Sequence, residues 1–284
     1  MILVNGEKVI EEHFPDNTLH LNLKELPNYC YEINIDWIYE SDAELFTLAC
    51  IVKHYNVSAN LFMPYIPHAR MDRVQNSSDV FTLKYFCDII NSLHFDKVVV
   101  RDPHSNVSLA LLNNVVEFET KEYIEKAILD FIGITKENIF PIKDCILFFP
   151  DQGAAKRYGS MNLGLPYTFG IKNRDWETGK ILSLEIANPK LVEGKRILIV
   201  DDICSKGGTF YYSAKALKES GAKEISLYVS HCENTILQGK ILDEDSLIKK
   251  IYTSKSLIHV PELKNKLYYV EDLPEKGDYI NDAD

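Results

Sequence analysis

The sequence predicts an α/β protein of two similar domains, each a mainly parallel β-sheet flanked by helices. Short β-type runs alternate with helical patterns, as in parallel strands joined by crossover helices. A chain of 284 residues is long enough for one large or two medium domains. A strand, a polar loop and a helix recur in outline in both halves. We therefore expect one domain over residues 1–125 and another over residues 126–284.

Five short runs rich in β-branched and aromatic residues predict strands. They cover Ala59–Pro64, Lys97–Arg101, Cys145–Phe149, Arg196–Val200 and Glu224–Ser230. Polar loops follow several of these strands. Because open α/β sheets bind ligands outside the carboxyl ends of their strands, these loops are the first candidates for a functional site.

Three helices are expected between these strands. They cover about residues 41–55, 78–94 and 209–221. Ser41 and Glu44 match a capping box at the start of the first helix, and Gly221 is a residue type that often ends a helix. Residues 113–144 are charged and mostly helical in pattern, so we expect the domain junction near them.

The composition indicates a soluble globular protein from a reducing compartment. The six cysteines are dispersed, with neither a C-x-x-C pair nor zinc-type spacing. A net charge of −11 argues against nucleic acid or an anionic membrane as partner, but it is compatible with small anionic ligands. The sequence shows no signal-peptide pattern and no apolar run of membrane-spanning length, so we expect a cytoplasmic protein.

The stretch Arg196–Thr209 carries the strongest functional signal. Its apolar part predicts a buried strand, and Asp201 and Asp202 follow at the carboxyl end. A two-glycine loop then precedes a helix; the loop residues are Ser205, Lys206, Gly207, Gly208 and Thr209. Such a loop lets backbone N–H groups and a helix N-terminus hold phosphate oxygens, although its spacing is not that of a Walker A motif. Because two carboxylates can hold sugar hydroxyls, the pattern predicts a ribose phosphate site.

Further loops carry groups that suit phosphates and metals. Arg70, after the first predicted strand, could clamp a polyphosphate, or it could be a surface arginine paired with Asp72. His104 follows the second strand, and a single histidine in a loop is more often polar surface than a ligand. Together with Asp151, which follows the third strand, His104 would form a mixed oxygen and nitrogen site for Mg²⁺.

The segment Phe169–Trp176 places Lys172 and Arg174 in a polar stretch that we expect to be mobile. Two cations so close together can neutralise a transferring phosphoryl group when such a loop closes over it. The alternative interpretation is a solvated connection that binds nothing.

Six ordered blocks resemble those of ribose-phosphate pyrophosphokinases, also called phosphoribosyl pyrophosphate synthetases. The resemblance covers most of the chain, up to about Ser230. The blocks are Phe14–Asp16, Pro64–Arg73, Asp102–His104, Pro150–Gly153, Ile171–Arg174 and Val200–Thr209. The resemblance implies two phosphoribosyltransferase-type domains, with the ATP side in the first and the ribose phosphate loop in the second.

The resemblance also implies an activity. Enzymes of this family transfer the β,γ-diphosphate of ATP to the anomeric hydroxyl of ribose 5-phosphate, which gives phosphoribosyl pyrophosphate for nucleotide biosynthesis and releases AMP. We accordingly expect Mg²⁺ as cofactor, ATP and ribose 5-phosphate as substrates, and a homo-oligomer with ATP sites between subunits.

The resemblance assigns roles to individual residues. The ATP site corresponds to Phe14, Asp16, Arg70 and Asp72, the Mg²⁺ ligands to His104 and Asp151, and the catalytic pair to Lys172 and Arg174. The ribose phosphate site corresponds to Asp201, Asp202, Ser205, Lys206, Gly207, Gly208 and Thr209.

The chain departs from the family in the loop that would hold the acceptor. Ser205 and Lys206 stand where the family has Asp-Thr, so a sugar-orienting carboxylate is lost and a cation is gained. We place ribose 5-phosphate first as the acceptor. The alternative is a substituted ribose phosphate such as ADP-ribose, which would connect the protein to NAD metabolism. Two other classes stay open: a non-catalytic regulatory homologue, and a phosphoribosyltransferase, which shares the Asp-Asp loop.

Overall fold

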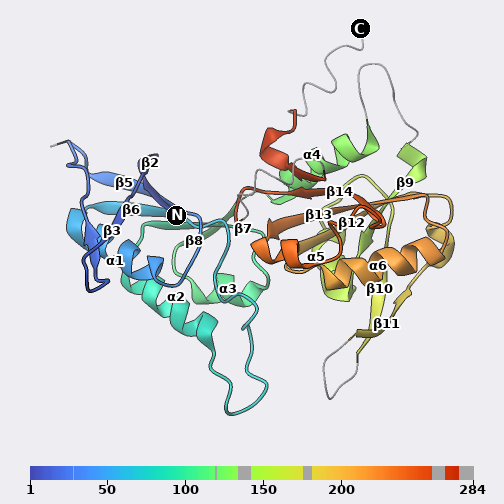
Figure 1. Cartoon of the computed structure of the whole chain (residues 1–284), viewed down its shortest axis with the longest axis horizontal. Helices are drawn as coiled ribbons and strands as arrows, with labels where there is room; N and C mark the ends of the chain where they lie inside the picture. The colour runs from blue at the N-terminus through green and yellow to red at the C-terminus, as the bar shows by residue number, and fades with distance from the viewer. Residues whose placement is uncertain (28, 119, 134–141, 175–180, 258–265, 275–284) are drawn as a thin grey trace, which may run out of the picture. The chain divides into compact units, whose positions relative to one another are not determined.

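The computed structural model describes the chain except for residues 28, 119, 134–141, 175–180, 258–265 and 275–284. The chain divides into two compact units, Met1–Phe118 and Glu119–Asp284 (Figure 1). The predicted boundary after residue 125 lies inside helix α4 (Thr120–Ile132), which begins unit 2. The assignment of ATP to the first half and ribose phosphate to the second stays a prediction.

Unit 1 is built on a six-stranded sheet in the order β2-β1-β5-β6-β7-β8. Strands β5 to β8 are parallel, whereas β1 is antiparallel to both β2 and β5. The element bounds are β1 (Ile2–Val4), β2 (Glu7–Lys8), β5 (Glu32–Trp37), α1 (Glu44–Tyr55), β6 (Ser58–Phe62), α2 (Thr82–Ser92), β7 (Lys97–Arg101), α3 (Asn106–Leu111) and β8 (Val115–Phe118). A separate hairpin consists of β3 (Glu11–His13) and β4 (Leu19–Leu21).

One face of the unit 1 sheet packs against helices. In β5, Ile33, Ile35 and Trp37 are buried, while the residues between them are more exposed. This alternation places the three apolar side chains on one face of the strand. The Trp37 ring contacts Phe86 of α2, with the ring centroids 6.0 Å apart. The apolar side chains of β5 therefore form one hydrophobic core with residues of α1 and α2.

The buried carboxylate of Glu44 organises the start of α1. Its Oε2 accepts hydrogen bonds from the indole of Trp37 (3.0 Å) and the amide of Glu40 (2.8 Å), and its Oε1 accepts one from the amino group of Met1. The amide of Ser41 also donates to Oε2, at 3.3 Å, so half of the predicted capping box is present. Burial raises the pKa of Glu44, but these donors outweigh burial and hold the pKa below its ordinary value.

We expect Glu44→Gln to destabilise unit 1 by about 1–3 kcal/mol, because buried donors lose a charged acceptor. A carboxylate whose pKa is lowered by folding stabilises the protein above its unfolded-state pKa, and this stabilisation disappears as the pH falls through the folded-state pKa. Denaturant unfolding should therefore show a larger loss at neutral pH than in acid. Glu40→Gln is the matched control, since Glu40 lies 3.3 Å from the same amino group with its side chain 61% exposed. Equal losses in the two variants would contradict this account.

Unit 2 is built on a seven-stranded sheet in the order β11-β10-β9-β12-β13-β14-β15. Its strands are parallel except at β11, which is antiparallel to β10. After α4, the bounds are β9 (Cys145–Phe149), α5 (Gln152–Gly159), β10 (Tyr167–Arg174), β11 (Ile181–Ile186), β12 (Arg196–Cys204), α6 (Gly208–Glu219), β13 (Glu224–Cys232), β14 (Ile248–Thr253) and β15 (Leu267–Tyr269).

The central strands of unit 2 are buried on both faces. Ile146 and Phe148 of β9 belong to the same hydrophobic cluster as Phe210 of α6. Leu147 and Phe149, which alternate with them, belong to a second cluster that includes residues of α4 and α5. Because successive strand residues point to opposite faces, α6 covers one face of the sheet and α4 and α5 cover the other.

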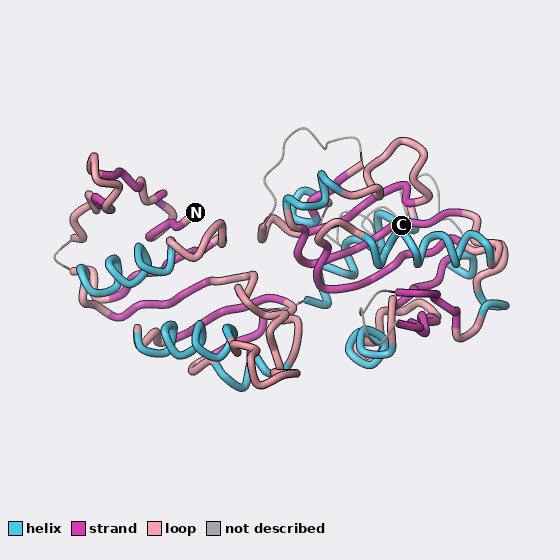
Figure 2. Tube along the Cα trace, turned by 60° about the horizontal axis from the view of Figure 1, so that its bottom comes forward, coloured by secondary structure: helices cyan, strands magenta, loops and turns pink. Residues whose placement is uncertain are grey.

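The predicted fold class is confirmed, since helices alternate with mainly parallel strands in both units (Figure 2). The predicted strands 97–101 and 145–149 coincide with β7 and β9. The strands predicted from Arg196 and Glu224 begin as expected but extend further, to Cys204 and Cys232. In the part of the chain that the structure describes, no helix is long and apolar enough to cross a membrane.

Two local predictions need correction. Helix α2 begins at Thr82, because the carboxylate of Asp79 accepts the amides of Gln75 (3.0 Å) and Asn76 (2.9 Å) and holds a turn before the helix. Residues 113–144, expected to be mostly helical, contain α4 but also a strand, since β8 pairs with β7 before α4 begins. Three of the four residues of β8, Val115, Val116 and Phe118, are types that favour strands, so this short strand does have a signal in the sequence.

Candidate functional site

Polar side chains gather near the carboxyl ends of three neighbouring strands of unit 2. Strands β10, β9 and β12 are adjacent in the sheet (Figure 1). Asp151 follows β9, Lys172 lies in the last part of β10, and Asp201 and Asp202 lie in the last part of β12. The structure therefore brings together residues that the sequence places in three separate motifs.

Asp151 is the N-cap of α5, and both of its carboxylate oxygens are engaged. Oδ1 accepts a hydrogen bond from the amide of Ala154 at 3.0 Å, and Oδ2 accepts one from the ammonium of Lys172 at 2.7 Å. Burial raises the pKa of Asp151, but Lys172 and the Ala154 amide outweigh burial and lower the pKa. Asp151 is therefore ionised at neutral pH, with Lys172 as its counter-ion.

Lys172 reaches Asp151 from a strand. The prediction of a mobile loop is wrong for residues 169–174, which belong to β10 and pair with both β9 and β11. The cause is the antiparallel partner Ile181–Ile186, which the sequence analysis did not identify as a strand. The side chain of Arg174 and all of residues 175–180 lie outside the described part of the chain.

Asp201 and Asp202 add two carboxylates to the cluster. Asp202 is buried, and its Oδ2 lies 3.8 Å from Nη1 of Arg157 in α5. Burial raises the pKa of Asp201, the carboxylates of Asp202 and Asp151 raise it further, and Lys172 opposes them. Three carboxylates and two cations thus share one electrostatic environment. Carboxylate oxygens in such a cluster can accept hydrogen bonds from sugar hydroxyls or bind a divalent cation.

The glycine loop leads from β12 into α6 as predicted. Gly207 has φ +75° and is the N-cap of α6, a conformation that favours glycine. Its carbonyl accepts the amide of Tyr211 at 2.9 Å. The first turn of a helix offers N–H groups without intrahelical acceptors, which suits an anion. Lys206 is exposed beside this helix start, so a cation accompanies the anion-binding geometry.

Sequence reasoning missed Arg157 and Gly170. Arg157 lies one helical turn after the glycine of the 150–153 motif, and nothing in its local sequence indicates that it approaches Asp202. Gly170 contains no chemical group, yet a Cβ at this position would lie 2.7 Å from the carbonyl oxygen of Pro150. Only a residue without a side chain permits this approach of β10 to the segment that carries Asp151. Close backbone approach is a tertiary property with no local signal in the sequence.

The ATP-type candidates in the first half lie in unit 1. Arg70 is exposed in the segment between β6 and α2, and Oδ1 of Asp72 lies 3.9 Å from Nε of Arg73. His104 is exposed just before α3. These residues are described within unit 1, so the pairing of His104 with Asp151 of unit 2 stays a prediction.

Phe14 and Asp16 lie in the turn of the β3–β4 hairpin. Oδ1 of Asp16 accepts hydrogen bonds from the hydroxyl (2.7 Å) and the amide (3.1 Å) of Thr18, and the pKa of Asp16 is lowered, chiefly by that hydroxyl. Phe14 is 51% exposed, and its ring centroid lies 4.9 Å from that of His20. The hairpin thus presents an aromatic surface and a carboxylate at its turn.

The donor set of unit 2 fits Mg²⁺ with few protein ligands. Among the described residues, no three histidine, cysteine or acidic side chains are grouped to hold a metal ion. Mg²⁺ commonly uses one or two carboxylates and completes its shell with water and substrate phosphates. Asp151, ionised and next to the carboxylate of Asp201, provides such a hard oxygen donor. We therefore find the residues compatible with Mg²⁺ bound together with a phosphate substrate.

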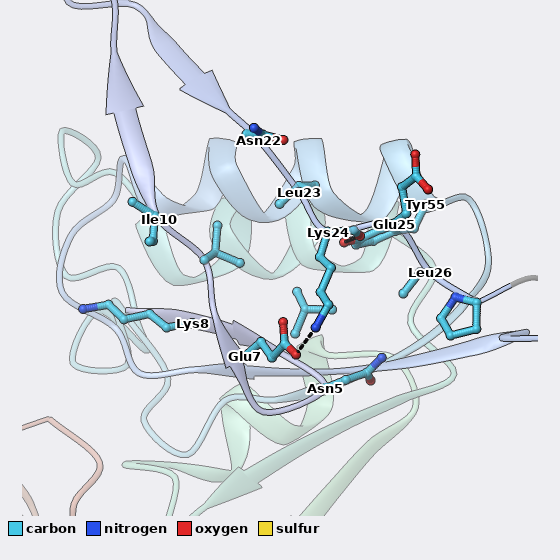
Figure 3. A pocket seen from close by; sticks show the side chains of 13 residues that line it. Asn5, Glu7, Lys8, Ile10, Asn22, Leu23, Lys24, Glu25, Leu26 and Tyr55 are labelled. Carbon is cyan, nitrogen blue, oxygen red and sulfur yellow. Dashed lines mark hydrogen bonds and ion pairs between the residues drawn. The ribbon is translucent and has the colours of Figure 1, made fainter.

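A separate cavity of about 390 Å³ lies in unit 1 (Figure 3). Lys24 and Glu7 form an ion pair of 2.5 Å at its side, and the hydroxyl of Tyr55 donates to the carbonyl of Lys24 at 2.7 Å. All its lining residues come from β1, β2, the segment 22–27 and the end of α1 or their neighbours. None of the predicted site residues lines this cavity, so it is not part of the candidate site.

A mainly parallel sheet in which one strand ends in a carboxylate pair, a glycine loop and a helix start is typical of a phosphoribosyltransferase-type domain. The family model described as "Phosphoribosyl transferase domain" matches residues 119–262, about half of the chain. The chain belongs to this family. The match begins where unit 2 begins, and it includes Asp151, Lys172 and the 201–209 loop.

Within this family, the chain is similar to ribose-phosphate pyrophosphokinases. It is 26% identical to "Ribose-phosphate pyrophosphokinase 1" of Listeria innocua over 89% of this chain and 78% of the relative. It is also 26% identical to the ribose-phosphate pyrophosphokinase of Saccharolobus solfataricus over 66% of this chain and 62% of that relative. The crystal structure of phosphoribosylpyrophosphate synthetase from Mycobacterium smegmatis has the same fold, with a TM-score of 0.71 at 16% identity over 92% of this chain and 85% of that one. The resemblance stated from the sequence is confirmed.

Proposed function

We propose that this protein is an ATP-dependent diphosphokinase that acts on ribose 5-phosphate. It would transfer the β,γ-diphosphate of ATP to the anomeric hydroxyl and release AMP and phosphoribosyl pyrophosphate. The observation that carries the proposal is the cluster of Lys172, Asp151 and Asp201 beside a glycine loop that begins a helix. The names of the curated relatives support the same reaction.

This transfer depends on positioning of the two substrates and on neutralisation of the phosphate charge more than on covalent catalysis. The anomeric oxygen forms a bond to the β-phosphorus, the bond from that phosphorus to the oxygen retained by AMP breaks, and the hydroxyl proton is released. Lys172 and Arg174 supply positive charge for the diphosphate. Asp201 and Asp202 accept hydrogen bonds from the ribose hydroxyls. Mg²⁺ held by Asp151, with His104 as second ligand, would neutralise charge on the phosphates.

The first half supplies the ATP contacts in this proposal. Arg70 and Asp72 hold the phosphates, while Phe14 and Asp16 contact the adenine from a neighbouring subunit of a homo-oligomer. A hairpin with an exposed aromatic residue at its turn suits such a contact. The proposal places the protein in the cytoplasm, where its nucleotide substrates are made.

The test is incubation of the purified chain with ATP, Mg²⁺ and ribose 5-phosphate, followed by mass analysis of the products. We expect equimolar AMP and phosphoribosyl pyrophosphate, and neither product after removal of the metal with EDTA. AMP with no transfer to any ribose phosphate would contradict the proposal. No AMP at all would favour a regulatory homologue, and consumption of added phosphoribosyl pyrophosphate with a base would favour a phosphoribosyltransferase.

A second candidate acceptor is a substituted ribose phosphate such as ADP-ribose. The observation that favours it is Lys206, an exposed lysine at the start of α6. By the resemblance, ribose-phosphate pyrophosphokinases have Asp-Thr where this chain has Ser205 and Lys206, so the positive charge is a departure from that family. ADP-ribose has a second phosphate group beyond the 5-phosphate position, and this group offers the ammonium an additional anionic contact. Its free anomeric hydroxyl would attack ATP in the same way.

Lys206→Ala distinguishes the two acceptors. If a diphosphate ester is the acceptor, we expect the KM for ADP-ribose to rise about 5–20-fold, as for loss of a charge-assisted contact. The KM for ATP should stay unchanged. If ribose 5-phosphate is the acceptor and Lys206 is a neutral change, both KM values should stay within about twofold, as for an exposed charge. The readout is steady-state AMP formation with each acceptor in parallel.

A further inference from the structure

The segment Cys232–Ile241 contacts residues 204–207, which lead from β12 into the glycine loop. Cys204 and Cys232 form the last register pair of β12 and β13. Immediately afterwards the amide of Glu233 donates to the carbonyl of Cys204 at 2.8 Å. The chain then forms a 3₁₀ helix, Asn234–Gln238, and returns to the loop. Two separate segments therefore stay in contact beyond the end of the sheet.

Gly239 meets the backbone of Lys206. A Cβ at this position would lie 1.9 Å from the carbonyl oxygen of Lys206 and 2.8 Å from its carbonyl carbon. The φ of Gly239 is −98°, which any residue can adopt, so lack of space and not backbone conformation requires glycine here. Because the neighbouring atoms are backbone, a side chain could be accommodated only if the peptide of Lys206 moved.

Ile241 meets the next residue of the loop. A Cβ at Gly207 would lie 2.4 Å from Cδ1 of Ile241 and 2.8 Å from its Cγ1. Ile241 is fully buried, and it belongs to the hydrophobic cluster that contains Phe210 of α6. The position of Gly207, with its φ of +75°, is therefore fixed against the core of unit 2.

We propose that Gly239 and Ile241 are positioning residues for the acceptor phosphate. They hold the backbone of Lys206 and Gly207 so that the first N–H groups of α6 are already arranged before the ligand arrives. Because the loop is already ordered, ligand binding does not lose the conformational entropy of the loop, and the affinity is higher. The inference rests on the proposed function only where it names ribose 5-phosphate as the ligand.

The first test is hydrogen–deuterium exchange of the ligand-free chain, wild type against Gly239→Ala. We expect faster exchange confined to the loop 204–209 and the start of α6. Ile248→Ala is the matched control, because Ile248 is buried in the same cluster but begins β14, opposite the start of β13. If Gly239→Ala raises exchange throughout unit 2 as the control does, the residue is merely structural and the proposal fails.

The second test measures binding of ribose 5-phosphate by calorimetry. We expect Gly239→Ala to weaken binding on the order of 10–100-fold, as for displacement of a positioned group, while the KM for ATP stays unchanged. Unchanged affinity would overturn the proposal. If the wild type does not bind ribose 5-phosphate, the proposed function fails, and the exchange experiment still decides the positioning role.

A double variant covers the case in which Gly239→Ala does not fold. Gly207→Ala should weaken ribose 5-phosphate binding, because alanine is strained at a φ of +75° and its Cβ would overlap with Ile241. Ile241→Ala removes that contact, so the double variant should bind more tightly than Gly207→Ala alone. Strictly additive effects of the two substitutions would show that Ile241 does not position Gly207, and would overturn its part in the proposal.

Discussion

Lys172→Ala is expected to lower kcat for AMP formation by about 10²–10³, the usual cost of a lost electrostatic donor in an active site. The side chain of Lys172 is 10% exposed and its ammonium lies 2.7 Å from Asp151, so the positive charge occupies a largely buried position at the proposed phosphate site. A charge held there before the reaction needs no reorganisation when negative charge develops on the transferring group. Steady-state kinetics with saturating ATP and ribose 5-phosphate measure the loss.

The control is Lys156→Ala, which removes an exposed lysine from α5 close in sequence to Asp151. Its kcat should stay within about twofold, as for an exposed charge. Lys172→Arg separates charge from shape: partial activity would indicate that positive charge is what matters. A Lys172→Ala enzyme with wild-type kcat would show that the ion pair with Asp151 is purely structural.

The sequence predicts the geometry of the glycine loop, residues 205–209, well because that geometry is local. Asp201 and Asp202 follow a continuous apolar run, and Gly207 has the positive φ that two adjacent glycines suggest. Strand, turn and helix start all lie within a few residues of one another. Interactions of this range leave a pattern that can be recognised in one sequence.

The rest of the site depends on contacts between distant segments. Arg157 of α5 approaches Asp202 only after β10, β11 and most of β12, and Gly239 approaches Lys206 after α6, β13 and a 3₁₀ helix. Residues 169–174 belong to a strand through pairing with β9 and β11, segments that are distant in the sequence or follow only after residues 175–180. None of these contacts has a sequence period or spacing, so only the folded chain reveals them.

Gly170→Ala is expected to disable the site without touching any charged group. The new Cβ would lie 2.7 Å from the carbonyl oxygen of Pro150, 3.2 Å from the ring of Phe148 and 3.3 Å from Leu184. Since the first neighbour is backbone, β10 must move away from the segment that carries Asp151. We expect a loss of about 1–3 kcal/mol in the free energy of unfolding, as for overpacking in a core.

The same displacement separates Lys172 from Asp151, because Lys172 lies two residues further along β10. A shift on the order of 1 Å at a reacting centre costs about 10²-fold in rate, so kcat should fall more than the stability loss explains. Gly159→Ala is the matched control: its Cβ would meet the hydroxyl of Tyr167 at 2.9 Å, the movable end of a side chain. Both variants should fold, but only Gly170→Ala should lose activity at temperatures well below its Tm. If Gly170→Ala keeps its kcat under those conditions, the approach of β10 to Pro150 serves packing alone, and the Lys172–Asp151 contact does not set the rate.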